Sequence, residues 1–127
     1  MERNTKQKSA VKEALVVADR PLTPFEILES AQAQVPGLGI ATVYRVLKAM
    51  TADGSVVPVE LPGSAPRYEM SHRGHHHHFH CRGCERVYEV AGCPQDLARF
   101  APPGFVLDGH EVVLYGRCST CVSVGGR

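Results

Sequence analysis

The sequence predicts an α+β fold with a helical first half and a β-rich second half that holds the metal ligands. Two observations support this division. Residues 5–52 contain three stretches with the apolar spacing of helices, separated by proline and glycine. Residues 72–84 hold six of the seven histidines, and all five cysteines come after residue 80. We therefore expect two small domains, residues 1–70 and 71–127, in this chain of 127 residues.

Three helices are predicted in the first domain. The first covers residues 5–18, with Thr5 as its N-cap. The second opens at Thr23, where Glu26 three residues later completes a capping box. The third covers residues 40–52, and its apolar stripe consists of Ile40, Val43, Leu47 and Met50.

A β-hairpin of residues 55–60 and 67–70 follows the third helix. Three helices followed by a hairpin is the order of a winged helix-turn-helix, in which the third helix enters the major groove of DNA. Four residues lie off the apolar stripe of that helix and are candidates for the DNA-facing side: Thr42, Tyr44, Arg45 and Lys48. In the second domain we expect strands at 75–81, 86–90 and 105–115, a short helix at 94–100 and a tail at 122–127.

Two CxxC pairs are the strongest chemical signal in the sequence. Cys81 and Cys84 form one pair, and Cys118 and Cys121 form the other. Two such pairs can fill a closed four-thiolate zinc site, and a metal clip would stabilise a domain too small for a large core. A redox dithiol or separate buried thiols are the alternatives.

The histidine run gives a second signal when it is placed on a strand. Alternation puts His76, His78 and His80 on one face and His75 and His77 on the other. Each face thus offers an imidazole pair for a separate metal site. The run is not a terminal tag, because it lies in mid-chain directly before a CxxC pair. Further ligands must come from elsewhere, and the candidates are Glu69, His72, Cys93, Asp96 and His110.

Composition narrows the class of protein. The net charge of +1 argues neither for nor against nucleic acid, although residues 1–12 are locally basic. No apolar run reaches 18 residues and no signal-peptide pattern is present, so we expect a cytoplasmic protein without a membrane span. The sequence contains no HExxH motif and no glycine-rich phosphate loop, and it does not favour an enzyme.

Several motifs together resemble the ferric uptake regulator (Fur) superfamily. They are the segment Gly39-Ile40-Ala41-Thr42-Val43-Tyr44-Arg45-Val46-Leu47, the histidine run with Cys81-x-x-Cys84, and His110 with Leu114-Tyr115-Gly116-x-Cys118. The resemblance covers nearly the whole chain. It implies a metal-sensing transcriptional repressor that binds operator DNA as a homodimer, with an N-terminal winged helix and a C-terminal α/β dimerisation domain.

The resemblance also implies residue roles. The structural zinc ligands would be Cys81, Cys84, Cys118 and Cys121. The sensing site would hold Glu69, His76 and His78, with His72 and Cys93 as extra potential ligands nearby. A second site in the dimerisation domain would hold His75, His77, Asp96 and His110. The DNA contacts would include Arg3, Tyr44 and Arg45.

The chemistry of these ligands favours zinc as the sensed metal. His77 stands where iron-type members of the superfamily often have Asp, and Cys93 offers a thiolate. A set rich in nitrogen with a thiolate suits Zn(II) better than Fe(II), which tolerates more oxygen ligands. We therefore predict a zinc-sensing repressor of metal uptake genes. The alternatives are an iron- or peroxide-sensing repressor with Fe(II) or Mn(II) as the regulatory ion, and a zinc-storage protein or metallochaperone.

Overall fold

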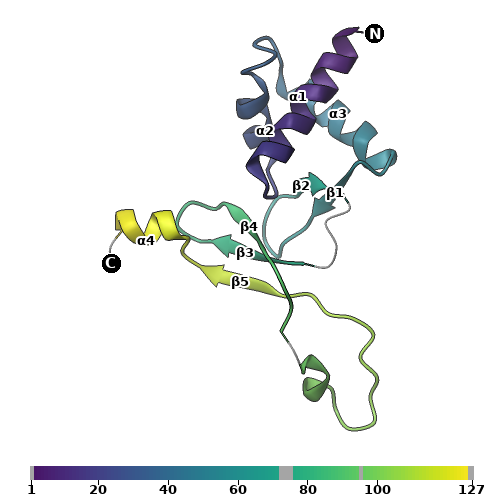
Figure 1. The fold of residues 1–127 in the computed structure, drawn as a ribbon, viewed down its shortest axis with the longest axis vertical. Helices are drawn as coiled ribbons and strands as arrows, with labels where there is room; N and C mark the ends of the chain where they lie inside the picture. The colour runs from purple at the N-terminus through teal and green to yellow at the C-terminus, as the bar shows by residue number, and fades with distance from the viewer. Residues whose placement is uncertain (1, 72–75, 95, 126–127) are drawn as a thin grey trace. The chain divides into compact units, whose positions relative to one another are not determined.

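The computed structural model describes residues 2–71, 76–94 and 96–125. The chain divides into two compact units, Met1–Arg73 and Gly74–Arg127 (Figure 1). The first unit contains α1 (Glu2–Ala18), α2 (Pro24–Ala31), α3 (Ile40–Ala52), β1 (Val56–Val59) and β2 (Arg67–Met70). The second contains β3 (His77–Cys81), β4 (Val87–Val90), the 3-10 helix η1 (Leu97–Phe100), β5 (Val113–Gly116) and α4 (Ser119–Gly125). Within the described residues, no helix has the length and apolar character needed to cross a membrane.

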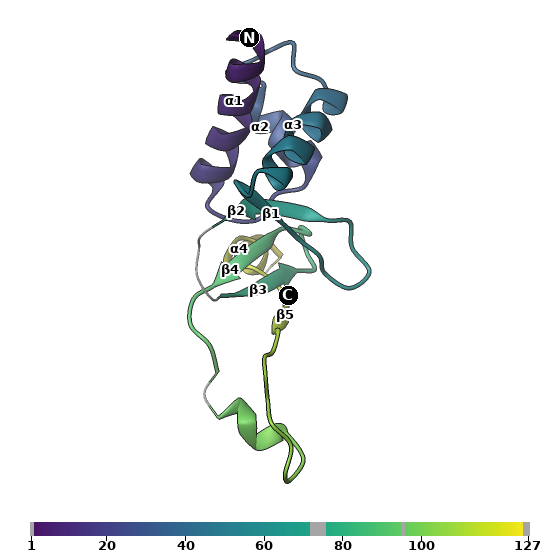
Figure 2. The same cartoon turned by 90° about the vertical axis from the view of Figure 1, so that its right-hand side faces the viewer.

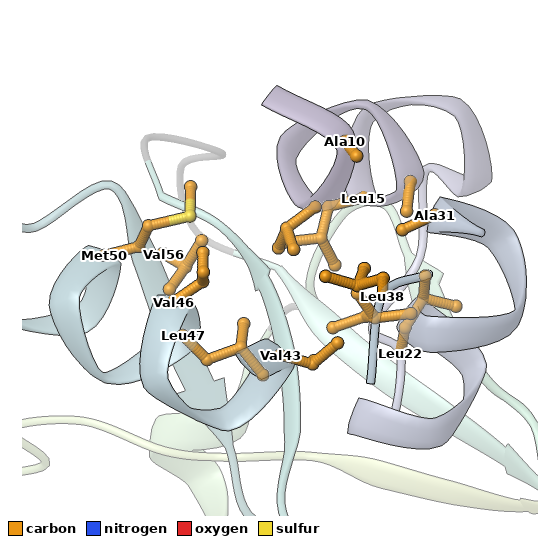
Figure 3. Close-up of a cluster of buried hydrophobic side chains, with 13 residues drawn as sticks. Ala10, Leu15, Leu22, Ala31, Leu38, Val43, Val46, Leu47, Met50 and Val56 are labelled. Carbon is orange, nitrogen blue, oxygen red and sulfur yellow. The ribbon is translucent and has the colours of Figure 1, made fainter. Parts of the chain in front are cut away.

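The first unit is a three-helix bundle with an antiparallel hairpin, as predicted. Strands β1 and β2 pair from Val56 opposite Met70 to Val59 opposite Arg67. The three helices enclose one apolar cluster, in which side chains of α1, α2 and α3 meet (Figure 3). Leu15, Ile27 and Leu47 are among its most deeply buried members. Helix α3 packs into this core through its buried residues Val43, Val46, Leu47 and Met50, and the opposite face of the helix is exposed.

The predicted helix boundaries are partly confirmed. The capping box is present, because the Thr23 side chain accepts from the Glu26 amide while the Glu26 carboxylate accepts from the Thr23 amide. Helix α3 has the predicted bounds. The prediction for α1 was wrong at its start: the helix begins at Glu2, so Thr5 lies inside it and is not its N-cap.

The second unit is built on a three-stranded sheet of order β4-β3-β5. The central strand β3 is antiparallel to β4 and parallel to β5. Between β4 and β5 the chain leaves the sheet as a loop of residues 91–112. The loop carries η1, and the structure describes all of its residues except residue 95. Figure 2 shows this loop running away from the strands.

Three predictions for the second unit were wrong. Residues 105–112 form no strand, because Pro102-Pro103-Gly104 precedes them, Asp108-Gly109 interrupts them, and β3 is too short to pair with them. The short helix is a single 3-10 turn, Leu97–Phe100. Part of the expected tail is helix α4, which starts directly after Cys118 and contains the second cysteine of its pair.

Candidate metal centres

The four cysteines of the two CxxC pairs converge on one point in the second unit. Their sulfurs all lie within 4.8 Å of one another. The Cys81 and Cys121 sulfurs are 3.6 Å apart, and those of Cys84 and Cys118 are 3.9 Å apart. Zinc–sulfur bonds of about 2.3 Å would place tetrahedral sulfurs about 3.8 Å apart. The cluster therefore has the ligand type and the spacing of a structural zinc site.

The parallel pairing of β3 and β5 explains this convergence. Cys81, the last residue of β3, pairs with Gly116, the last residue of β5. Both strands thus end at the same edge of the sheet, and each is followed at once by a CxxC turn. The backbone amide of Cys118 donates to the Cys81 sulfur at 3.2 Å, and that of Cys84 donates to the same sulfur at 3.4 Å.

These contacts change the acidity of the thiols. Burial raises the pKa of Cys81, but backbone amides that donate to its sulfur outweigh burial and bring the pKa down to about 6. Hydrogen bonds from the Cys121 amide and the Tyr88 hydroxyl lower the pKa of Cys118. The neighbouring Cys81 sulfur raises the pKa of Cys121 to about 12. The lowered pKa values favour the thiolate forms of Cys81 and Cys118, whereas the raised pKa of Cys121 favours its thiol. A bound divalent cation would favour the thiolate form of all four ligands.

Two residues beside this cluster were not among the predicted site residues. A Cβ atom on Gly83 would lie 2.8 Å from the Cys121 sulfur and 3.6 Å from the Cys81 sulfur, so the turn requires glycine there. The Tyr88 hydroxyl bonds to Cys118, which raises the pKa of Tyr88. The glycine inside Cys81-x-x-Cys84 was a usable signal, whereas nothing in the sequence marks Tyr88.

A second cluster lies at the opposite edge of the same sheet and contains His77, Cys93 and His110. The His110 Nε2 atom is 2.8 Å from the Cys93 sulfur and 3.2 Å from His77 Nε2. The Cys93 sulfur is 3.5 Å from His77 Nε2. His77 is buried, and Cys93 is exposed.

This cluster differs from the predicted second site. His77 and His110 meet as expected, but the third member is Cys93, which had been placed with the sensing ligands. Asp96 is exposed at the start of η1, with its carboxylate 4.0 Å from the Arg99 guanidinium, and lies outside the cluster. His75, the remaining predicted ligand, lies outside the described residues.

The predicted sensing ligands come from both units. In the second unit the His76 and His78 rings meet edge to face, with centroids 4.9 Å apart, so the predicted pairing of alternate histidines is present. Glu69 belongs to β2 of the first unit, opposite Val57. His72 lies outside the described residues. The complete sensing set therefore stays a prediction.

The predicted DNA-facing residues follow helix α3. Tyr44, Arg45 and Lys48 are exposed on the side opposite the buried stripe, and Thr42 is half-buried. The Arg45 guanidinium donates to the Gln7 carboxamide at 3.4 Å, which links α3 to α1. Arg3 lies in the first turn of α1.

The fold and the ligand clusters define a metal-binding protein with a winged helix-turn-helix domain. Comparison with known proteins makes the class specific: the chain belongs to the ferric uptake regulator family, whose sequence pattern matches residues 2–115. It is a metal-responsive transcriptional regulator.

Two curated relatives illustrate the match. The chain is 31% identical over 122 residues to the ferric uptake regulation protein of Campylobacter jejuni, covering 92% of this chain and 78% of that protein. It is 35% identical over 123 residues to the transcriptional regulator FurA of Mycobacterium tuberculosis, covering 94% and 82%.

Solved structures with the same fold include uptake regulators named for different metals. A zinc-bound manganese uptake regulator matches with a TM-score of 0.78 and 25% identity, over 88% of this chain and 87% of that one. FurB of M. tuberculosis, described as a zinc uptake regulator, matches with a TM-score of 0.52 and 27% identity, over 94% and 95%. The Fur protein of Helicobacter pylori, described as having three functional metal-binding sites, matches with a TM-score of 0.67 and 25% identity, over 91% and 79%.

Proposed function

We propose that this chain is a zinc-responsive repressor of metal uptake genes, which binds operator DNA as a homodimer in the cytoplasm. The observation that carries the proposal is the chemistry of the ligand clusters within the described part of the second unit. One cluster consists of four thiol sulfurs, and the other combines two imidazole nitrogens with one thiol sulfur. Such donors favour zinc, whereas Mn(II) and Fe(II) accept more oxygen.

We assign the regulatory ion to Glu69, His76 and His78, with His72 as a further ligand. The contact between the two imidazole rings supports this assignment, because it brings two nitrogen donors close together. A metal that binds ligands from both units stabilises one arrangement of the DNA-binding units over others. Zinc then needs only to bind the DNA-competent arrangement more tightly to shift the population towards it.

Exposed apolar side chains in the second unit support the homodimer. Phe100, Phe105 and Val106 expose 83%, 69% and 84% of their surface. A monomeric protein rarely leaves such a group in water, and a second copy of the chain is the partner that we propose for it. The dimer would present two α3 helices to successive half-sites of the operator.

We assign the DNA contacts to Arg3, Thr42, Tyr44, Arg45 and Lys48. The exposed face of α3 supports this assignment, since three of these side chains project from it. Arg45 suits a phosphate or a guanine edge, and the Tyr44 ring can pack on a thymine methyl group.

The test is operator binding measured against buffered free Zn(II), Fe(II) and Mn(II). We expect half-maximal DNA binding at far lower free Zn(II) than the other ions require. His78→Ala should abolish the zinc dependence and leave a folded dimer. Tyr44→Ala and Arg45→Ala should each weaken DNA binding by about 1–3 kcal/mol at unchanged zinc content.

The outcomes separate the alternatives. If Fe(II) drives operator binding at a lower free concentration than Zn(II), the protein is an iron sensor. The C. jejuni relative is named as a ferric uptake regulation protein, which is why this alternative is tested. If the wild-type protein binds zinc but shows no affinity for the operator with any of the three ions, a storage protein or metallochaperone would be supported instead.

A further inference from the structure

The sheet of the second unit brings three further metal-ligating side chains together at the edge opposite the four cysteines. At this edge β3 begins with His77, which pairs with Val90, the last residue of β4. Cys93 follows β4 by three residues. His110 precedes β5 by three residues, and β5 runs parallel to β3. One edge thus collects a residue from each of three chain segments.

The separations of the three donor atoms fit a cation. Bonds of about 2.05 Å to nitrogen and 2.3 Å to sulfur place tetrahedral ligands about 3.3 Å apart for two nitrogens and about 3.6 Å for nitrogen and sulfur. His77 and His110 present nitrogens 3.2 Å apart, and the Cys93 sulfur is 3.5 Å from the His77 nitrogen. The 2.8 Å between Cys93 and His110 is tighter. Cys93 is exposed and can move outward to reach the ideal separation.

We propose that His77, Cys93 and His110 bind a second zinc-class ion, with the Cys93 thiolate in place of the carboxylate of Asp96. Hydrogen bonding alone explains the cluster less well: each imidazole nitrogen either carries a proton or accepts one, so the three mutual contacts cannot all be linear hydrogen bonds at once. A cation is shared by all three donors at once.

The thiolate decides which ions the site accepts. Zn(II), Co(II) and Cd(II) bind sulfur well, whereas Mn(II) and Mg(II) prefer oxygen. Asp96 would have widened the choice towards those ions, but its carboxylate is exposed and lies beside Arg99. A hollow of about 300 Å³, lined in part by His77, Cys93 and Leu114, adjoins the three donor atoms. A water molecule or another small ligand can reach the ion from there.

The position of the site gives it a structural effect. Cys93 lies near the start of the 91–112 loop and His110 near its end, while His77 belongs to the sheet. An ion at this point ties both ends of the loop to the central strand, at the base of the excursion seen in Figure 1. The loop carries Phe100, Phe105 and Val106, so occupancy of the site would order the apolar side chains assigned above to the dimer.

Cobalt spectroscopy of the full-length chain, with zinc retained in the four-cysteine site, tests the proposal. Added Co(II) should produce a sulfur-to-cobalt charge-transfer band in the near ultraviolet. Cys93→Ser should remove this band and lower the total zinc content by one equivalent. His110→Ala should likewise lose one equivalent. Circular dichroism checks that both variants remain folded.

Asp96→Asn is the matched control, because it alters the carboxylate that the resemblance implied as ligand. We expect it to keep both the band and the metal content. Loss of cobalt binding in Asp96→Asn, or an unchanged band in Cys93→Ser, would overturn the proposal. The cobalt and zinc measurements use no DNA. They can therefore disprove the His77, Cys93 and His110 site while zinc-dependent operator binding persists. Conversely, absence of zinc-dependent operator binding would not contradict this site.

Discussion

Gly83 determines whether four sulfurs can approach one another. The chain at this residue packs directly against the Cys121 and Cys81 side chains, with no room for a methyl group. A side chain here would push apart two of the four zinc ligands. Since tetrahedral coordination tolerates only a few tenths of an ångström of displacement, this glycine is part of the metal site although it supplies no ligand.

Gly83→Ala should therefore weaken zinc retention and destabilise the second unit. The new Cβ would lie 2.8 Å from the Cys121 sulfur, so the Cys121 side chain or the turn that holds Gly83 must move. The rate of zinc transfer to a chromophoric chelator measures the effect. Gly37→Ala is the control, because a Cβ at that position meets no atom within 4 Å. Equal transfer rates in the two variants would contradict this account of Gly83.

Individual ligands differ in how far the sequence predicts them. The four zinc cysteines are predictable because each CxxC spacing already fixes half of a tetrahedral site. The grouping of Cys93 with His77 and His110 could not be predicted from the sequence, because it depends on the parallel pairing of β5 with β3. A parallel pairing leaves no local signal, whereas a hairpin is marked by its turn.

The capping box at α2 shows an element whose start is decided locally. Thr23 and Glu26 exchange hydrogen bonds of 3.1 and 2.9 Å, and Pro24 occupies the first turn. Four consecutive residues suffice for this signal, so the sequence predicts it correctly. The start of α1 has no comparable signal, and the helix extends to Glu2 because no residue before Thr5 opposes it.

Thr23→Ala should lower the free energy of unfolding of the first unit by about 1 kcal/mol, since the Glu26 amide loses its partner. Urea unfolding followed by far-ultraviolet circular dichroism measures this change. Thr51→Ala, at an exposed position within α3, should stay within about 0.5 kcal/mol of the wild type. A similar loss in both variants would show that the cap adds nothing beyond ordinary helix propensity.

Elements of the second unit were harder to predict, because tertiary context overrides local preference there. Phe105 and Val106 have strong strand propensity, yet they stay outside the sheet, which has no partner strand for them. Helix α4 forms where the second CxxC turn directs the chain, with the Val122 amide bonded to the Cys118 carbonyl at 2.9 Å. The turn that carries the second CxxC pair thus sets where this helix begins.

At the scale of the whole molecule, the apolar core is divided unequally. Among the described residues, Cys81 and Val87 are the buried hydrophobic residues of the second unit, and all the others belong to the first. The first unit is therefore stabilised by burial of apolar side chains. The second lacks such a core, and metal coordination must supply much of its stability.

Removal of zinc should therefore affect the two units differently. After treatment with a strong chelator under reducing conditions, we expect amides of β3, β4 and β5 to lose protection from hydrogen exchange. Amides of α1, α2 and α3 should keep theirs, because their core contains no metal ligand. A second unit that stays protected without metal would show that its sheet is stable by itself.

The parallel pairing of β3 with β5 also governs when the chain can fold during its synthesis. Every contact of the first unit's core is available once α3 and the hairpin have left the ribosome. The sheet of the second unit lacks its third strand until residue 116 is added, and its zinc ligands are incomplete until Cys121 follows. Growing chains thus pass through a stage in which the first unit is folded while three thiols and several imidazoles of the second unit are still exposed. Any zinc bound then is held loosely, so the ion can settle into its final site only after the second CxxC pair has been made.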